Sequence, residues 1–444
     1  MNTMEKTETN LTKNNTSITS KDWLQKLKNE SWEAELLVSA IAIFGTFQLF
    51  KVINWTTNWF IDILDPSQYI VAYFIVFFGL IAISTLVAMF VIHFFLRAYW
   101  IGLVGLNSVF PDYSIEDSAY SKIYTEKILS ILPKLTDSIE KVDKLCSVIF
   151  SVAFTLLLML AYMAFFASVY LLLFNLLSEY IPTYILLIPL IIFFIVYTLQ
   201  MIISIVANVK KYKENVKIQT WYFKIVKIGS IFMLGPLYKN ILQITMIFGS
   251  NFKKNKALTK LIIAFMFSGM LVSFIKIKDT NIFYLIGKSF DIATDYSKPF
   301  SSFYKTENKD IDFLLTPQLE SDVITTKLTK LFIPIFEHER NSFQKNCPEF
   351  EDDDTKDRNE NRIKGWQNKL DCYNNYHQIL INDKVIEVDF NKYYHPKTKQ
   401  FGVICYLKAT DFVEGKNILT VKKINAKENS TTKWLIPFQY YKNY

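Results

Sequence analysis

The stretch that decides the fold is LCSVIFSVAFTLLLMLAYMAFFASVYLLLFNLL, residues 145–177. None of its 33 residues is Asp, Glu, Lys, Arg or His, whereas a helix needs only about 20 apolar residues to cross the hydrocarbon core of a bilayer. Residues 181–209 form a second uncharged stretch, and only Ser178, Glu179 and Tyr180 separate the two. This pattern predicts two transmembrane helices joined by a tight hairpin.

A similar hairpin precedes this one in the chain. Residues 36–64 are mostly apolar, and residues 69–96 hold a single side chain that can be charged near neutral pH, His93. The turn Asp65-Pro66-Ser67 between them leaves room only for a tight connection. We predict that Ser31 caps the first helix, because its hydroxyl can accept a hydrogen bond from a free backbone N–H of the first turn. The two hairpins together predict four spans.

Two later segments decide the number of spans. Residues 228–248 are apolar, but Gly235-Pro236 interrupts them, Lys239 lies among them, and lysines flank both ends. We interpret this segment as an interfacial or re-entrant helix on the cytosolic face. Residues 258–277 are then the fifth span. If residues 228–248 also cross the bilayer, the spans number six and the C-terminal domain lies on the opposite side.

The distribution of basic residues predicts the orientation. The chain has a net charge of +8, and residues 279–444 hold 24 basic and 24 acidic side chains, so the whole excess precedes them. The loops at 97–144 and 210–227 are rich in Lys and Arg, whereas the connection at 51–68 is not. The positive-inside rule therefore predicts a cytosolic N-terminus and contact with anionic lipid headgroups on that side. With five spans, the C-terminal domain is extracytoplasmic.

The N-terminal arm, residues 1–30, is polar and has no apolar core of the kind that a signal peptide needs. We expect this arm to be disordered, and we expect the first apolar helix to serve as an uncleaved insertion signal. These features predict a multi-pass protein of the plasma membrane, such as a bacterial inner membrane.

Residues 114–144, between the hairpins, predict an amphipathic cytosolic helix. Five apolar residues recur at alternating spacings of four and three, which is typical of a helix with one apolar face. This face either packs on neighbouring helices or forms a seam between copies of a homo-oligomer. The seam consists of Ile128, Leu132, Leu135, Ile139 and Val142.

The C-terminal part is polar and changes pattern along its length. We predict a mixed connecting lobe over residues 279–371 and a mostly β soluble domain, an antiparallel sandwich, over residues 372–444. Asn382-Asp383 is typical of a hairpin turn. Apolar and polar residues alternate as in half-buried strands at 385–390, 402–407, 418–424 and 434–440.

The cysteines bear on the compartment of this domain. Cys347 and Cys372 flank a charged segment, and we predict a disulfide between them if the domain is extracytoplasmic. Cys405 lies within a predicted strand and Cys146 within a span, so we expect both to be buried and free.

Few side chains suggest a functional site in the predicted spans. His93 and Arg97 are one helical turn apart, and they form either a functional intramembrane pair or a contact between helices near the headgroups. Lys51, Asn54 and Asn58 share one face at the outer end of the first span. They either line a water-filled vestibule or mark where the helix leaves the hydrocarbon.

The sequence contains no P-loop, no dinucleotide-binding glycine motif, no Gly-x-Ser-x-Gly elbow and no zinc-ligand spacing. We therefore predict no catalytic residue, no metal site and no cofactor. The basic residues are scattered through loops, which argues against nucleic acid as a partner. The preferred hypothesis is a non-enzymatic binding, sensing or scaffold protein with a protein or small-molecule ligand. A channel or transporter subunit is the alternative, and a membrane enzyme is third.

Overall fold

The computed structural model describes residues 4–110, 119–177, 180–252, 256–287, 301–306, 311–339, 357–425 and 430–442. The chain divides into two compact units. The helical unit consists of Met1–Val52 and Phe78–Ile277, and the β-unit consists of Ile53–Phe77 and Lys278–Tyr444. The first two long helices contribute residues to both units.

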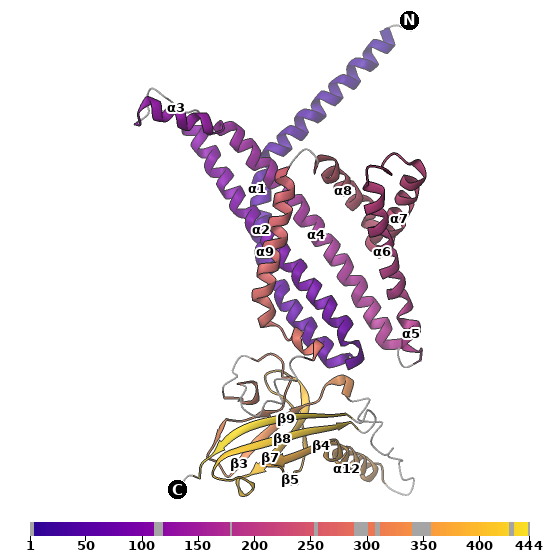
Figure 1. The fold of residues 1–444 in the computed structure, drawn as a ribbon, viewed down its shortest axis with the longest axis vertical. Helices are drawn as coiled ribbons and strands as arrows, with labels where there is room; N and C mark the ends of the chain where they lie inside the picture. The colour runs from indigo at the N-terminus through magenta and orange to yellow at the C-terminus, as the bar shows by residue number, and fades with distance from the viewer. Residues whose placement is uncertain are drawn as a thin grey trace. The chain divides into compact units, whose positions relative to one another are not determined.

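The described residues up to Lys276 are almost entirely helical (Figure 1). Their elements are α1 Met4–Ile63, η1 Pro66–Gln68, α2 Tyr69–Val109, α3 Lys122–Ile131, α4 Leu135–Leu177, α5 Thr183–Leu186, α6 Ile188–Asn208, α7 Val216–Leu234, η2 Gly235–Leu237, α8 Tyr238–Phe252 and α9 Lys256–Lys276.

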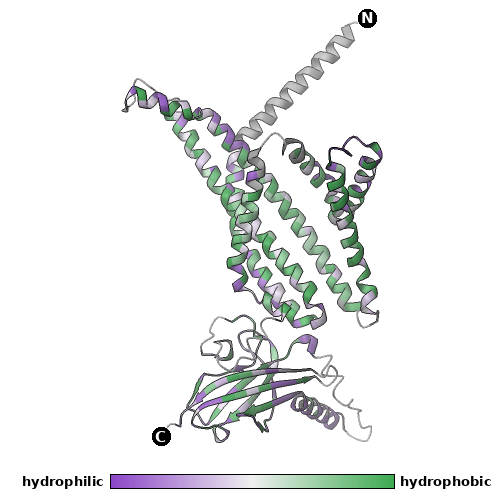
Figure 2. Cartoon of the chain, in the orientation of Figure 1, coloured by the Kyte–Doolittle hydropathy of each residue, from purple (hydrophilic) through white to green (hydrophobic). Residues whose placement is uncertain are grey.

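Four helical segments within the described residues are long and apolar enough to cross a membrane. They are Ser31–Ile63, Pro66–Val109, Lys122–Phe174 and Tyr184–Asn208. In Figure 2 most of the residues of these segments have the colours of hydrophobic residues. This agrees with the predicted multi-pass membrane protein built on two helical hairpins. The predicted fifth span coincides with α9, and the count of five stays a prediction.

The helices α1, α2, α4 and α9 pack around one apolar cluster in the helical unit. Leu86 and Phe90 of α2, Ile149 of α4 and Phe265 of α9 are buried in it, and Ile43 of α1 packs against it. Away from this cluster many large apolar side chains are exposed, as expected where hydrocarbon, and not water, surrounds a helix.

The start of the first helix differs from the prediction. Ser31 lies inside α1, which begins at Met4, so Ser31 is not a helix cap and the backbone of the arm predicted to be disordered is helical. The first Gly or Pro of the chain is Gly45. Nothing in the arm therefore interrupts a helix that extends backwards from the first span.

Two other predicted helices are divided in the structure. The amphipathic helix at 114–144 is broken at Leu132–Lys134, between α3 and α4, because Pro133 cannot donate the backbone hydrogen bond that a helix interior requires. The segment 228–248 belongs partly to α7 and partly to α8, because Gly235 adopts a φ of +49° and Pro236 follows it. Its interfacial position stays a prediction.

The β-unit holds nine strands among its described residues and one long helix, α12 Arg358–Tyr376. Short 3-10 turns precede the strands, at Ile277–Asp279, Ile282–Ile286 and Ser301–Phe303. The strands are β1 Gln318–Leu319, β2 Val323–Ile324, β3 Leu328–Pro334, β4 His377–Ile381, β5 Lys384–Ile386, β6 Asn391–Tyr394, β7 Phe401–Lys408, β8 Gly415–Asn425 and β9 Ser430–Tyr440.

These strands form two sheets that contribute to one hydrophobic core. The four-stranded sheet has the order β1-β3-β7-β6, and the five-stranded sheet has the order β2-β9-β8-β4-β5. All of the pairings between neighbouring strands are antiparallel except that of β2 with β9. Leu331 and Val403 from the first sheet and Leu419 and Ile436 from the second are fully buried in the shared core.

The predicted strands near the C-terminus agree with the structure, but the strands β1, β2 and β3 were not predicted. The predicted strands at 402–407, 418–424 and 434–440 lie within β7, β8 and β9. Asn382 and Asp383 join β4 to β5 with positive φ values, as a two-residue hairpin turn requires. Strands β2 and β3 of the predicted connecting lobe pair with β9 and β7, so each sheet contains residues from both sides of the predicted boundary at residue 372.

Candidate functional site

Three helices bring charged side chains together inside the helical unit. Arg97 of α2 is 1% exposed, and its Nη1 donates to Asp143 Oδ1 of α4 at 2.7 Å. Its Nη2 lies 3.0 Å from Glu35 Oε2 of α1. These three side chains are named the ion cluster. Because a buried guanidinium is costly without a counter-charge, the two carboxylates stabilise Arg97 and link α1, α2 and α4.

His93 extends the ion cluster by one helical turn. Its Nδ1 lies 2.7 Å from Ser39 Oγ, and Ser39 Oγ donates to the Glu35 backbone oxygen at 2.6 Å. The serine hydroxyl has one hydrogen, so this network assigns a hydrogen to His93 Nδ1. His93 also packs on Phe150 of α4, with ring centroids 5.3 Å apart. The pair predicted from the sequence therefore forms contacts between helices.

Aromatic side chains cover the ion cluster on one side. The Arg97 guanidinium carbon lies 4.5 Å from the centre of the Trp100 ring, within the range of a cation–π contact, and Trp32 packs on Trp100. Among the described residues, the buried nitrogens His93 Nε2, Arg97 Nε and Trp100 Nε1 have no hydrogen-bond partner. Through its ion pairs and ring contacts the cluster can hold α1, α2 and α4 together.

A second constellation lies in the β-unit, where the turn between α1 and α2 meets the residues around β3. The Glu337 N–H donates to Asp62 Oδ1 at 3.1 Å, and His338 Nδ1 lies 3.1 Å from the Asp62 backbone oxygen. Asn281 Nδ2 donates to Asn58 Oδ1 at 2.7 Å. We refer to these three bonds as the hairpin-turn contacts.

Aromatic rings surround the hairpin-turn contacts. Tyr69 lies 6.1 Å, between ring centroids, from both Tyr284 and His338. Phe336 stacks on His338 at 5.7 Å. Burial raises the pKa of Tyr284 well above its ordinary value, and the nearby Tyr69 and Glu339 act in the same direction. The Tyr284 hydroxyl therefore stays neutral at ordinary pH, and its ring packs among the other aromatic rings of this constellation.

A buried ion pair lies beside this constellation. Lys423 of β8 is 4% exposed, and its Nζ donates to both Glu339 oxygens at 2.9 and 2.7 Å and to the Pro334 backbone oxygen at 2.7 Å. Lys423 faces His377 across the β4–β8 pair. Burial, and then the Lys423 charge, lower the pKa of His377 to about 3. His377 is thus neutral at ordinary pH and is part of the core.

The other residues singled out in the sequence are placed as follows. Lys51 is exposed and Asn54 is half-buried, whereas Asn58 is buried against Asn281. The vestibule face therefore stays a prediction for Lys51 and Asn54 and is not favoured for Asn58.

The predicted oligomer seam is interrupted in the structure. Leu132 is 45% exposed and has an extended backbone, because the chain breaks there before Pro133. Ile128 lies on α3, whereas Leu135, Ile139 and Val142 lie on α4, and these four side chains are half-buried. The five residues therefore do not lie on one continuous helix, and the oligomer seam stays a prediction.

The cysteines have different environments. Cys146 and Cys405 are buried and free, as predicted. Cys372 is disulfide-bonded. Cys347 lies outside the described residues, so its pairing with Cys372 stays a prediction. Burial raises the pKa of the Cys405 thiol to about 12, so this thiol is unreactive in the folded protein.

The sequence did not reveal Glu35 and Asp143 as partners of Arg97. The sequence feature that could have revealed these two residues is a carboxylate near the cytosolic end of each of two spans, at the same predicted depth as Arg97. No group of three or more His, Cys, Asp or Glu side chains in the described part of the chain is arranged to hold a metal ion.

No family model, no curated protein and no solved structure matches this chain.

Proposed function

We propose that this chain is a non-enzymatic binding, sensing or scaffold protein of the membrane. Its β-unit lies outside the cytosol and binds a protein or small-molecule ligand, and its helices form the membrane base. The proposal rests on the fold and on the environment of the charged side chains.

The hairpin-turn contacts carry the proposal. The turn between the first two spans lies on the side of the membrane opposite the N-terminus. Because Asp62 and Asn58 bond to Glu337, His338 and Asn281 within one compact unit, the strands following α9 lie on that same side. An N-terminus on the cytosolic side therefore leaves the β-unit outside the cytosol.

The packing of α9 supports the odd number of spans that this arrangement needs. A Cβ atom on Gly269 would lie 2.9 Å from the Thr85 Cα atom, and Ser273 Oγ lies 3.5 Å from the Leu80 backbone oxygen. Thr85 and Leu80 are in the interior of the second span. A helix that touches them lies at the same depth in the bilayer, which supports the proposal that α9 is the fifth span. The disulfide bond of Cys372 also fits an oxidising compartment.

The ion cluster favours this proposal over a channel or transporter. In a conduction pathway, charged side chains face a water-filled lumen or a substrate. Here Arg97 is buried and forms ion pairs with two carboxylates of neighbouring helices, so its charge is balanced within the protein.

Current across planar bilayers that contain the purified chain tests the choice between the two functions. We expect no selective current above that of protein-free bilayers. The Arg97→Gln variant serves as the control, because it disrupts the ion cluster and would alter a pathway that passes through it. A reproducible selective current from the unaltered chain, changed in this variant, would overturn the proposal in favour of a channel.

A further inference from the structure

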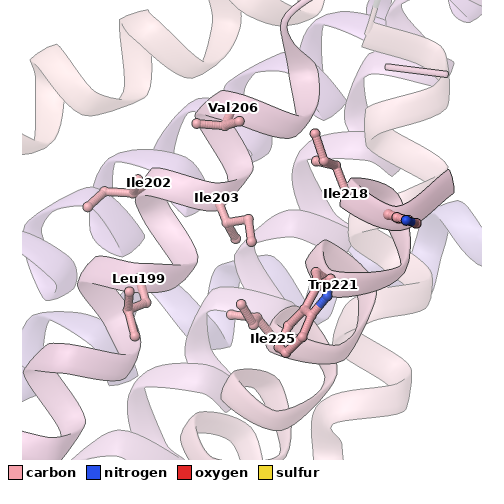
Figure 3. A pocket seen from close by; sticks show the side chains of 8 residues that line it. Leu199, Ile202, Ile203, Val206, Ile218, Trp221 and Ile225 are labelled. Carbon is pink, nitrogen blue, oxygen red and sulfur yellow. The ribbon is translucent and has the colours of Figure 1, made fainter. Parts of the chain in front are cut away.

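The hairpin of α6 and α7 holds an open apolar groove of about 380 Å³ (Figure 3). Figure 3 shows the labelled side chains of the two helices on the two sides of this space. The lining side chains include Leu199, Ile202 and Val206 from α6 and Ile218, Trp221 and Ile225 from α7.

The groove is a defined feature of the fold, because contacts outside it hold α6 and α7 together. Gln219 Nε2 donates to the Ala207 backbone oxygen at 2.9 Å, and Ser204 and Tyr222 are within hydrogen-bond distance of each other. Gly229 is in such close contact with Gln200 that a Cβ atom would lie 2.3 Å from Oε1. The apolar side chains of the groove are not needed for these contacts and remain open to a ligand.

Positive charge borders the groove. Lys217 is its one charged lining residue. Lys224, seven residues further along α7, lies over the Trp221 ring, with 5.9 Å between its Nζ and the ring centre. Residues seven apart share a helix face, so the two ammonium groups lie on the face of α7 that carries Trp221. The segment 210–227 holds six lysines and one acidic residue, Glu214.

We infer that this groove binds one anionic phospholipid molecule. An acyl chain occupies the apolar space, and the phosphodiester group lies between Lys217 and Lys224. A purely apolar occupant, such as the helix of a partner, would leave the two charges without a counter-ion. A lipid headgroup satisfies both requirements, because basic residues at the end of membrane helices attract anionic headgroups. The proposed site requires only that α6 lies in the membrane. That the bound lipid belongs to the cytosolic leaflet rests on the proposed topology.

Quenching of Trp221 fluorescence by brominated lipids tests this site in the full chain. The protein is reconstituted in zwitterionic vesicles that contain a small fraction of brominated phosphatidylglycerol or of brominated phosphatidylcholine. The contribution of Trp221 is the difference between the unaltered chain and Trp221→Phe. We expect phosphatidylglycerol to quench Trp221 at an apparent affinity about 25-fold higher than phosphatidylcholine, because each of the two lysines near the surface contributes a preference of about fivefold.

Two double variants distinguish binding at this site from general electrostatic attraction between the protein and anionic lipids. Lys217→Gln with Lys224→Gln should bring the preference close to one, whereas Lys227→Gln with Lys239→Gln, which removes the same charge elsewhere, should retain it. Equal quenching by both lipids in the unaltered chain would mean ordinary contact with bulk lipid and would overturn the inference. Absence of quenching by either lipid would mean that a protein segment covers the groove, and would also overturn it. The two outcomes that would overturn the inference are measured on the unaltered chain and Trp221→Phe, so they do not depend on whether the lysine variants fold.

Discussion

The two units of this chain differ in where their apolar side chains lie. In the β-unit, Leu331, Leu419 and Ile436 are fully buried in a core shared by two sheets. In the helical unit, Phe44 and Phe274 are 75% and 76% exposed. Hydrophobic burial therefore holds the β-unit together, whereas the helices depend on a few close or charged contacts.

This difference follows from the solvent around each unit. Water drives apolar side chains into a core, and lipid does not, because hydrocarbon is as apolar as a leucine side chain. Helices in a bilayer must therefore be fixed by local packing and by polar bonds, such as the ion cluster and the contact of Gly269 with Thr85. The predictions below test whether burial stabilises the β-unit and whether local contacts and ion pairs stabilise the helical unit.

The largest effect is expected in the ion cluster. Arg97→Met leaves Glu35 and Asp143 without their shared counter-charge, and we expect the free energy of unfolding to fall by about 3–5 kcal/mol. Unfolding in mixed micelles, followed by circular dichroism, measures it. The triple variant with Arg97→Met, Glu35→Met and Asp143→Leu should recover most of this loss, since no buried charge remains. A triple variant as unstable as the single one would contradict the ion-pair explanation.

Removal of an apolar side chain should have different effects in the two units. Leu331→Ala creates a cavity in the core of the β-unit, and we expect a loss of about 2–5 kcal/mol. Phe274→Ala removes a larger side chain from an exposed face of α9, and we expect a change within about 0.5 kcal/mol. Chemical denaturation of each variant measures both. Equal losses would mean that the face of α9 is covered and that the comparison between units is wrong.

An added methyl group should destabilise the helical unit at one glycine and not at another. In Gly269→Ala the new Cβ would lie 2.2 Å from Thr85 Oγ1 and 2.9 Å from Thr85 Cα, so α9 must move away from α2, at a cost of about 1–3 kcal/mol. At Gly45, no atom lies within 4 Å of the position that a Cβ would take, so Gly45→Ala is the matched control. Thermal unfolding should separate the two variants, and equal midpoints would argue against close packing of α9 on α2.

Taken per pH unit, the smallest of these effects is the dependence of the β-unit on acid. His377 has its pKa lowered to about 3, whereas the unfolded chain has the ordinary value of 6.5. Between these two values the unfolded state binds more protons, so stability is complete above pH 6.5 and falls as the pH approaches 3. The loss is at most about 1.4 kcal/mol per pH unit. Urea unfolding at several pH values should show this slope, and His377→Asn should reduce it. An unchanged slope in the variant would exclude His377 as its source.

Local patterns explain which parts of the fold were predicted. The two apolar hairpins, the strands within β7, β8 and β9, and the Asn382-Asp383 turn each follow from residues close together in the sequence. The strand β3 was missed because its residues, LTKLFIP, do not alternate and its partner β7 lies some seventy residues later.

The ion cluster was only half predicted for a similar reason. His93 and Arg97 stand out, because charged or titratable side chains are rare within spans. Their partners Ser39, Glu35 and Asp143 lie on two other helices, and which helices meet depends on tertiary packing. The early start of α1 was missed because the polar composition of the arm was given more weight than its lack of Gly and Pro.

The side of the membrane on which the β-unit lies is the central claim, and thiol labelling measures it most directly. Cys146 and Cys405 are fully buried, which keeps their background low. Val413→Cys places a thiol at a position 62% exposed in the β-unit, and Ile123→Cys places one at a position 70% exposed in α3. With a membrane-impermeant maleimide on intact cells, we expect Val413→Cys to be labelled, and Ile123→Cys only after lysis. Labelling of Val413→Cys only after lysis would contradict the account.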